Sequence, residues 1–472
     1  MRILYFHQYF ATRRRSTATR SYELARRLVE RGHQVTIVSR DTRALEHDRP
    51  EAPRGRLIAR ETVDGIDVMF ISMPYSNYFG PAARVASFAG FTVAASIAGL
   101  LLPKPDVVFA SSTPLTIGIP GLLVSRLKDV PFVFEIRDLW PAVPVALGAL
   151  RGRPLIALAE RLERLLYREA RRVVVLSEGS GAALVKMGVP AEKLVFVPNA
   201  SDLDLFQPDV REPGFRARHG LEGKLVALYS GAMGRANGLD QLLDSAAVLK
   251  HEGIEDVAFV AVGEGAAKPR LLQRVADEGL DNVLFLPPVA KTALAGIVGA
   301  ADVTLTLFAP YPVLQTNSPN KLFDSLAAGR PVIVNLDGWL RRVVEEAGAG
   351  VYVPAGDGEA LATTLAALAR EPGLVATMGA NARSLAEREF DRDVMADRLA
   401  EALEEAAGHR EAADRATTGH AAPAGHAADA ECQAVRHGAA PSVGAGPAPS
   451  PPAVPDDVDA AVPRPAEESA DA

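Results

Sequence analysis

Cysteine is nearly absent from the chain. Cys432 is the only cysteine among 472 residues, so no intramolecular disulfide and no thiolate metal site can form. The first residues, MRILYFHQYF, also lack the basic start, the long apolar run and the small-residue cleavage site of a secretion signal, and they predict a first strand instead. Together these absences favour a reducing, cytoplasmic setting.

An excess of positive charge is missing as well. The net charge is −7, and from His409 onward four arginines stand against ten acidic residues, which leaves −1 for everything before that point. A nearly neutral body gives no electrostatic basis for binding nucleic acid. No Cys/His cluster with metal-ligand spacing occurs either, so we expect no metal ion and no other cofactor.

What the chain does contain is a regular alternation of short apolar runs and segments of helical period, such as Arg20–Glu30. A first series of apolar runs begins at residues 3, 34, 106, 131, 171 and 193, and a second at 224, 256, 282, 302, 331 and 350. Such alternation predicts βαβ units with parallel sheets covered on both faces. The expected fold class is therefore α/β, with two Rossmann-like, doubly wound domains.

The boundaries follow from changes in composition. Polar, glycine- and proline-bearing sequence near residues 209–220 separates the two series, which predicts one domain over residues 1–208 and another over 209–390. A helix over 391–408 is expected to fold back on the first domain. Residues 409–472 are rich in Ala, Pro and acids and predict a disordered tail.

Two local features refine this outline. Asp64-Gly65 lies in the middle of GRLIARETVDGIDVMFIS and predicts the tight turn of an inserted hairpin. The stretch TNSPNKLFDSLAAGRPVIV, residues 316–334, predicts a helix directly after a strand and its loop, with Ser318 as N-cap and Pro319 at the first helical position.

That helix start is the strongest candidate for a binding site. In open α/β sheets ligands bind beyond the carboxyl ends of the strands, where helix N-termini attract anions. The N–H groups from Asn320 to Leu322 are placed to bind a diphosphate, with Lys321 adding a cation, and Asp324 is placed to accept hydrogen bonds from ribose hydroxyls. The alternative is a capped core helix with a solvated Asp324, and the spacing alone does not decide between the two.

The same stretch resembles the sugar-nucleotide signature of glycosyltransferase family 4, the retaining enzymes of the GT-B fold. In the family this signature ends in an acid followed by small residues, Gly and Pro-Val; the matching positions are Asp324, Ala327, Ala328, Gly329, Pro331 and Val332. Further similar stretches are RSYELARRLVERGHQVTIV, SSTPLTIG, FEIRDLWP, VLSEG, VPNASDLDLF and YSGAMGRANGLDQLL. FEIRDLWP and SSTPLTIG are most similar to the branch that extends lipid-linked bacterial surface polysaccharides, which includes fucosaminyltransferase-like members.

The resemblance implies a glycosyltransferase that moves a sugar, with retention, from a nucleotide sugar to a polyprenyl-diphosphate-linked saccharide. It assigns the acceptor side to residues 1–208 and the sugar nucleotide to 209–390, and it places the enzyme in the cytoplasm at the inner face of the membrane. Two alternatives stay open: a sugar-nucleotide epimerase on a similar scaffold, and a catalytically inactive sugar-nucleotide-binding protein.

The sequence departs from the family pattern on the donor side. The family carries another acid eight positions before Asp324, and here that position is Thr316. We expect Thr316 and Asn317 to hydrogen-bond the donor sugar in its place.

The loop that begins at Gly231 also departs from the pattern, because it lacks the family's Arg and Lys and keeps Arg235 as its only cation. We expect Arg235 to bind the diphosphate, helped by Lys268 or Lys321, since a guanidinium can engage phosphate with two hydrogen bonds. The alternative is a solvent-facing loop arginine.

The first domain supplies the remaining candidates. By resemblance, Asp138 in FEIRDLWP contacts the transferred sugar near its reacting carbon and is the expected catalytic residue, the alternative being a helix cap. Arg137 beside it and His7, at the end of the first strand, are expected to line the cleft. The alternative for His7 is a structural histidine whose ring nitrogens are satisfied within the protein.

The family's Gly-Gly turn before the first helix has no counterpart in the loop Arg13–Ala18. Close approach of its backbone to a ligand is therefore not expected. Arg15 and Thr17 are expected to line the acceptor side, where the three arginines either bind an anionic acceptor or form a solvated loop.

The run Phe88–Leu102 is apolar nearly all round but is only fifteen residues long, whereas a membrane-spanning helix needs about 20. It predicts either a buried helix of the first domain or a helix that dips into a bilayer with Tyr75, Tyr78, Phe79 and Arg84, so that a lipid-linked acceptor reaches the cleft.

Overall fold

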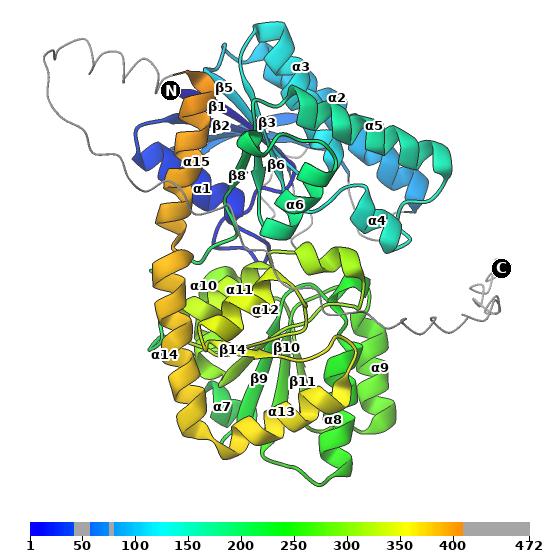
Figure 1. The fold of residues 1–472 in the computed structure, drawn as a ribbon, viewed down its shortest axis with the longest axis vertical. Helices are drawn as coiled ribbons and strands as arrows, with labels where there is room; N and C mark the ends of the chain where they lie inside the picture. Colours follow the sequence, from blue (N-terminus) through cyan, green and yellow to red (C-terminus); the bar gives the residue numbers. More distant parts are fainter. Residues whose placement is uncertain (42–56, 75–79, 409–472) are drawn as a thin grey trace, which may run out of the picture. The chain divides into compact units, whose positions relative to one another are not determined.

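The computed structural model describes residues 1–41, 57–74 and 80–408. The predicted tail, 409–472, and the candidates Tyr75, Tyr78 and Phe79 lie outside these ranges. Within them the chain forms two separate sheets with helices on both faces of each (Figure 1), which confirms the predicted α/β fold class.

The first sheet has the strand order β3-β4-β2-β1-β5-β6-β7-β8. Its strands are β1 (Arg2–His7), β2 (Gln34–Arg40), β3 (Ile58–Val63), β4 (Ile66–Ile71), β5 (Val107–Ser111), β6 (Phe132–Ile136), β7 (Arg172–Val175) and β8 (Leu194–Phe196). All neighbours pair in parallel except β3 and β4. Asp64 and Gly65, with φ values of 49° and 81°, form the turn between these two strands, so the predicted hairpin is confirmed.

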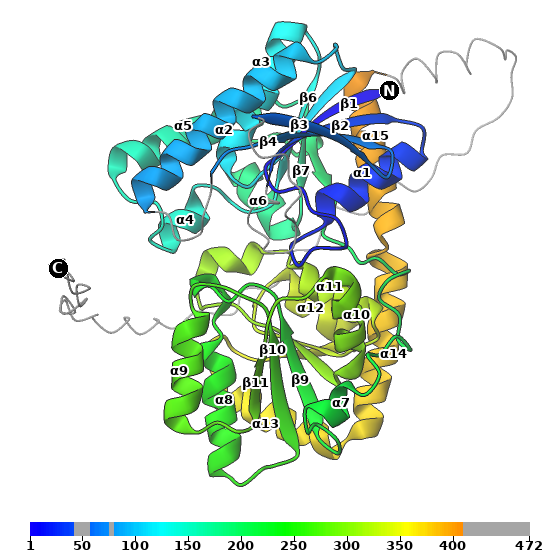
Figure 2. The same cartoon turned by 180° about the vertical axis from the view of Figure 1, so that it is seen from behind.

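Side chains alternate between the two covered faces of this sheet. Tyr5 packs in a cluster with α1 (Arg20–Glu30) and α15 (Arg392–Ala407), whereas Leu4 and Phe6 pack with helices of the opposite layer (Figures 1 and 2). That layer contains α2 (Pro81–Leu101), α3 (Gly118–Lys128), α5 (Arg153–Glu169) and α6 (Glu178–Lys186), and the short α4 (Ala142–Ala146) precedes α5. Burial on both faces explains why strands such as β1 and β5 are continuous apolar runs.

The second sheet is entirely parallel, with the order β11-β10-β9-β12-β13-β14. Its strands are β9 (Leu225–Ser230), β10 (Val257–Val262), β11 (Val283–Leu286), β12 (Val303–Thr306), β13 (Val332–Val334) and β14 (Gly350–Tyr352). Its helices are α7 (Phe215–Arg218), α8 (Asp240–His251), α9 (Lys268–Glu278), α10 (Lys291–Ala300), α11 (Asn320–Ala327), α12 (Trp339–Glu346), α13 (Gly358–Arg370) and α14 (Pro372–Glu389). Strand β9 lies between β10 and β12, so the order in which the chain adds strands changes direction beside β9. Doubly wound folds bind ligands at this point of the sheet.

The last two helices belong to different sheets. α14 packs against α11, and α15 packs against α1 and strands of the first sheet. Between them the backbone of Asp391 pairs with Ser201, which follows the last strand of the first sheet. The chain therefore returns to the first sheet at Asp391.

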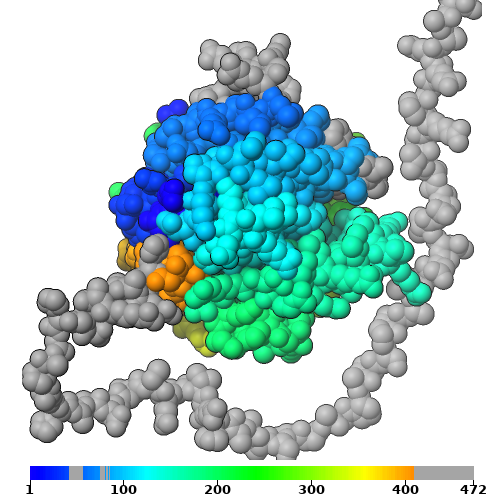
Figure 3. Space-filling view, turned by 90° about the horizontal axis from the view of Figure 1, so that it is seen from above, coloured from blue at the N-terminus to red at the C-terminus, as the bar shows by residue number. Residues whose placement is uncertain are grey.

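The expectation of a buried helix over Phe88–Leu102 is wrong for one side of α2. Val93, Ile97 and Leu101 are 60%, 54% and 77% exposed, whereas Phe91 on another side of the helix is buried. Residues of α2, α3 and α5 lie side by side on one face of the molecule (Figure 3). Among the helices of the described ranges, none is long and apolar enough to cross a membrane.

Candidate functional site

A pocket of about 560 Å³ lies at the carboxyl ends of the second sheet's strands. It is lined by residues 230–232 at the end of β9, 262–264 at the end of β10 and 288–289 after β11. The starts of α10 and α11 and residues 16–19 also line it. These are the strand ends and helix starts at which the fold predicts anion and nucleotide binding.

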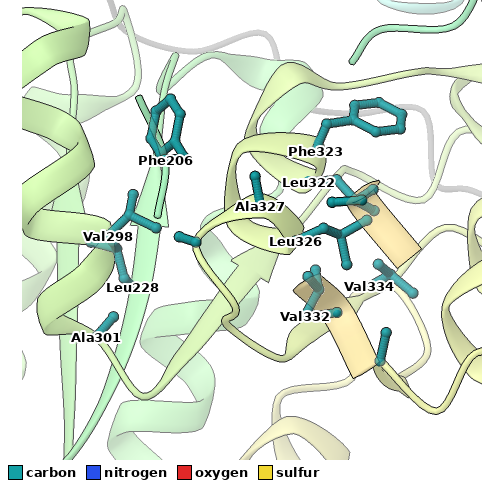
Figure 4. Packing of buried hydrophobic residues seen from close by; sticks show 14 of the residues in the cluster. Phe206, Leu228, Val298, Ala301, Leu322, Phe323, Leu326, Ala327, Val332 and Val334 are labelled. Carbon is teal, nitrogen blue, oxygen red and sulfur yellow. The ribbon is translucent and has the colours of Figure 1, made fainter. Parts of the chain in front are cut away.

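Helix α11 is fixed by its apolar side. Leu322, Phe323 and Leu326 are fully buried and pack in one cluster with strand residues such as Val332 (Figure 4). The polar residues at the start of the helix are thereby left to face the pocket, and Asn320, Lys321 and Asp324 all line it.

The start of α11 differs from the prediction in its cap. Pro319 occupies the N-cap position without a side-chain hydrogen bond. The Ser318 hydroxyl instead accepts a hydrogen bond from the Asn199 N–H (3.2 Å), and the Asn199 side-chain amide donates to the Ser318 carbonyl. The prediction that the Leu322 N–H is available to bind a diphosphate is also wrong. This N–H donates to the Pro319 carbonyl (3.2 Å) and is engaged within the turn.

Lys321 carries the most telling electrostatic feature of the pocket. Its Nζ is buried, has no hydrogen-bond partner among the described residues, and lies 3.6 Å from the ring centroid of Tyr229. Burial lowers the pKa of Lys321 well below its ordinary value. Burial therefore favours the uncharged amine in the free protein, whereas an anionic ligand beside it would favour the ammonium. This position suits an anionic ligand.

Two glycines bring the backbone close to this ammonium. A Cβ on Gly231 would lie 3.4 Å from the Lys321 Nζ, and a Cβ on Gly263 would lie 1.9 Å from the Gly231 carbonyl oxygen. Both residues have positive φ values, 129° and 151°, which side-chain-bearing residues rarely adopt. Gly263 belongs to the VGEG sequence after β10, a signal too short to identify the site on its own.

Lys291, the first residue of α10, is a site residue that the sequence did not reveal. Its Nζ lies 3.0 Å from an Asp202 oxygen, 3.3 Å from the Thr19 hydroxyl and 3.4 Å from Asp324 Oδ1. Burial raises the pKa of Asp324 above its ordinary value, and Lys291 opposes that rise. No sequence motif marks Lys291, because its three partners come from distant parts of the chain.

Two predicted donor ligands lie elsewhere. Arg235 is exposed and lines a separate pocket of about 440 Å³, together with Asp240 and Arg270. Lys268 donates to the Gly263 carbonyl (2.8 Å) and to the carbonyl of Leu286 (3.2 Å). The structure therefore brings only Lys321 of the three predicted cations to the larger pocket.

Comparison with known proteins identifies the family. Residues 17–200 match the family described as Glycosyl transferase 4-like domain, and residues 224–371 match Glycosyl transferases group 1. The chain is a family 4-like glycosyltransferase of the GT-B fold.

Individual relatives agree with this assignment. WcaI of Escherichia coli, which is named as a colanic acid biosynthesis glycosyl transferase, is 27% identical over 300 residues, covering 61% of this chain and 72% of WcaI. The sucrose-phosphate synthase of Thermosynechococcus elongatus superposes with a TM-score of 0.67 at 18% identity, over 86% of this chain and 98% of its own. HepE of Anabaena, solved in complex with UDP-glucose, superposes with a TM-score of 0.63 at 18% identity, over 86% of this chain and 100% of HepE.

In the glycosyltransferase, Thr316 lies away from the larger pocket. The Thr316 hydroxyl donates to the Val313 carbonyl (2.9 Å), and its methyl group would lie 3.1 Å from a Cβ on Gly179 of α6. The carbonyl of Asn317 accepts from the Trp339 indole (3.1 Å). Thr316 and Asn317 are thus engaged with their own surroundings, and neither lines the pocket.

In the first sheet of the glycosyltransferase, His7 and Arg137 form a pair beyond β1 and β6. The His7 Nδ1 lies 3.3 Å from the Ser111 carbonyl, and its Nε2 lies 3.4 Å from an Arg137 nitrogen. Burial, together with the Arg137 guanidinium, lowers the pKa of His7 to about 3. The ring is therefore neutral, with Nδ1 as donor and Nε2 as acceptor, and it positions Arg137.

Asp138 follows this pair in the chain and is partly buried. Burial raises the pKa of Asp138, with Arg137 acting in the opposite direction. Asp138 is not among the residues that line the larger pocket. A role in catalysis therefore remains a prediction from the family resemblance.

The glycine-free loop before α1 reaches the larger pocket. Thr17 and its neighbours line the pocket, and the carbonyls of Arg15 and Arg13 accept from the N–H groups of Lys291 (3.0 Å) and Thr292 (3.4 Å). The Arg13 guanidinium pairs with acidic side chains, Glu23, Asp202 and Asp204. Residues 16–19, where the family has its glycine turn, carry small side chains. The Arg13 guanidinium is held by acidic side chains of the protein itself.

Proposed function

We propose that this glycosyltransferase uses a nucleotide-sugar donor and extends a polyprenyl-diphosphate-linked saccharide, with retention, in bacterial surface or exopolysaccharide biosynthesis. The observation that carries the donor class is the unpaired Lys321 ammonium, because a diphosphate is the anion whose size and charge suit it. The UDP-glucose bound by HepE and the colanic acid assignment of WcaI support the donor and the pathway.

In this mechanism the departing nucleoside diphosphate is stabilised by Lys321 and by the N–H groups at the start of α11. A positioned donor in a dry site contributes about 3 kcal/mol to such a step. Asp324 accepts the ribose hydroxyls, and Asp138 acts near the reacting carbon while the acceptor hydroxyl attacks from the same face. We expect neither a metal nor another cofactor to take part in this step.

A donor and acceptor panel tests this function. UDP-, GDP-, dTDP- and ADP-sugars are offered with and without a polyprenyl-diphosphate-linked saccharide, and nucleotide release is followed for wild type, Asp138→Ala and the exposed control Asp281→Ala. We expect acceptor-dependent release of one nucleotide, abolished in Asp138→Ala and retained in the control. Nucleotide binding without release under any condition would instead support the inactive binding protein.

We further propose that the exposed face formed by α2, α3 and α5 rests on the cytoplasmic membrane surface. Its apolar residues include Val93, Ile97 and Leu127. The side chains of Arg164 and Arg168 on α5 are 66% and 72% exposed, and they lie 3.6 Å from Glu160 and 3.1 Å from Glu169. Apolar side chains beside basic ones are the composition of an interfacial surface that binds anionic lipid.

Vesicle binding tests this surface. Replacing both Val93 and Ile97 with Glu is expected to weaken sedimentation with anionic vesicles by about tenfold or more, since two buried apolar contacts are exchanged for repelled charges. Leu374→Glu, at an exposed apolar position of α14, is the matched control and should bind as wild type does. Equal binding of all three proteins would exclude this face as the membrane contact.

A further inference from the structure

We propose that Lys291 is a positioning residue for the donor: its ammonium orients the Asp324 carboxylate toward the ribose of the nucleotide. The inference rests on the nucleotide-sugar function proposed above. It assigns a role to a lysine that lies outside the family's sugar-nucleotide signature.

The first argument is the geometry of the ammonium. Lys291 is 7% exposed and lines the donor pocket, where its Nζ lies between Asp202, Thr19 and Asp324. Its own N–H donates to the Arg15 carbonyl, which fixes the start of α10. The lysine is thus held at both its backbone and its side chain, as a positioning group must be.

The second argument concerns what Asp324 lacks. Asp324 Oδ1 is buried and accepts no hydrogen bond from the described residues, although the Lys291 ammonium lies 3.4 Å away. A carboxylate oxygen that is oriented by a nearby positive charge but receives no hydrogen bond can still accept one from a ligand hydroxyl. Lys321, whose ammonium contacts Tyr229, is left free for the diphosphate.

The charges around Asp324 give the proposal a measurable pH signature. Besides Lys291, the charged groups that act on it are Asp202, which follows β8, and Arg392 of α15. Burial and Asp202 raise the pKa of Asp324, while Lys291 and Arg392 lower it. Removing Lys291 raises this pKa further, so nucleotide affinity that depends on the ionised carboxylate is lost at a higher pH as the solution is acidified.

The variant should still fold, because Asp202 keeps a second partner. Arg392 Nε lies 2.6 Å from Asp202 Oδ1, on the oxygen that Lys291 does not contact. Burial raises the pKa of Asp202, but Arg392 and Lys291 together hold it below its ordinary value. Thermal unfolding of Lys291→Met provides the check that the protein tested is native.

The experiment is calorimetric titration of wild type, Lys291→Met, Asp324→Asn and the double variant with UDP, GDP, dTDP and ADP, and separately with inorganic pyrophosphate, from acidic to neutral pH. For the nucleotide that wild type binds, Lys291→Met should weaken affinity about tenfold, as expected for one lost charge-assisted contact. The pH below which the nucleotide affinity of this variant falls should be higher than in wild type, and its pyrophosphate affinity should stay unchanged. In the Asp324→Asn background the Lys291 substitution should add nothing.

Distinct outcomes overturn distinct claims. If wild type binds none of the nucleotides, the proposed function fails and this inference fails with it. If wild type binds one of them but Lys291→Met has the same affinity and pH profile, or weakens pyrophosphate equally, only the positioning role is refuted. Additive effects of the two substitutions would likewise show that Lys291 does not act through Asp324.

Discussion

Replacing Lys321 with methionine is expected to lower kcat/KM for the nucleotide sugar by about 100-fold or more, the usual effect of losing one positioned charge donor. The same substitution should leave the free protein equally or more stable, by up to about 1 kcal/mol, because it removes a buried amine that has no hydrogen-bond partner among the described residues. Activity and stability therefore change in opposite directions, as they do when a site is held ready for a charged ligand. Steady-state kinetics and thermal unfolding of the same preparation measure the two effects.

Arg235→Met is the matched control for this experiment. Arg235 is the cation that the sequence favoured, but it lines the other pocket, so its loss should change kcat/KM less than tenfold, below about 1.4 kcal/mol. If Arg235→Met abolished activity and Lys321→Met did not, the assignment of the diphosphate site to the start of α11 would be wrong.

Replacing Arg20 with methionine is expected to lower the free energy of unfolding by about 3–5 kcal/mol, the usual effect of breaking a buried ion pair. Arg20 is 1% exposed, lies 2.6 Å from Glu135, and donates to the carbonyls of Val197 and Pro198 at 2.8 Å each. The substitution leaves the fully buried Glu135 without its cation and the two carbonyls without donors. Urea unfolding of both proteins at neutral pH measures the difference.

Arg26→Met, on the same helix, is the control. Arg26 is 25% exposed and pairs with Glu30 one turn away. It also lies 3.5 Å from Glu23, which keeps Arg13 and Arg27 as partners, so the loss of Arg26 should cost no more than about 1 kcal/mol. The Arg20 effect should also depend on pH. Burial opposes ionisation of Glu135, but Arg20 holds the pKa of Glu135 below its ordinary value. The stabilisation is then present above the ordinary carboxyl range and is lost as the pH falls through the lowered pKa, so a difference that is constant with pH would contradict the ion-pair explanation.

Much of the fold could be predicted because its signals are local. The helix Arg20–Glu30 was predicted with the bounds that the structure has, and every predicted strand of both sheets is present. A strand buried on two faces must be apolar throughout, and an amphipathic helix must repeat with its own period, so each element leaves a pattern in a short stretch of chain. The turn at Asp64-Gly65 was predictable for the same reason.

The residues of the site were only partly predictable. The start of α11, with Asn320, Lys321 and Asp324, is a local feature, and the sequence alone marked it. The prediction that Ser318 caps this helix was wrong, because the Ser318 hydroxyl accepts a hydrogen bond from Asn199, more than a hundred residues earlier in the chain. Signals of that kind cannot be seen in a window of neighbouring residues.

The sequence by itself determined the two parallel sheets, the family and the helix start that lines the larger pocket. Only the tertiary structure decided which cation lies in the pocket. Arg235, Lys268 and Lys321 all lie near strand ends in the sequence, and only the packing of the folded chain determines which of their side chains reaches the pocket. It also decided that Lys291 belongs to the site. The physical reason is that a charged side chain is positioned by the partners that surround it, and those partners come together only when the chain is folded.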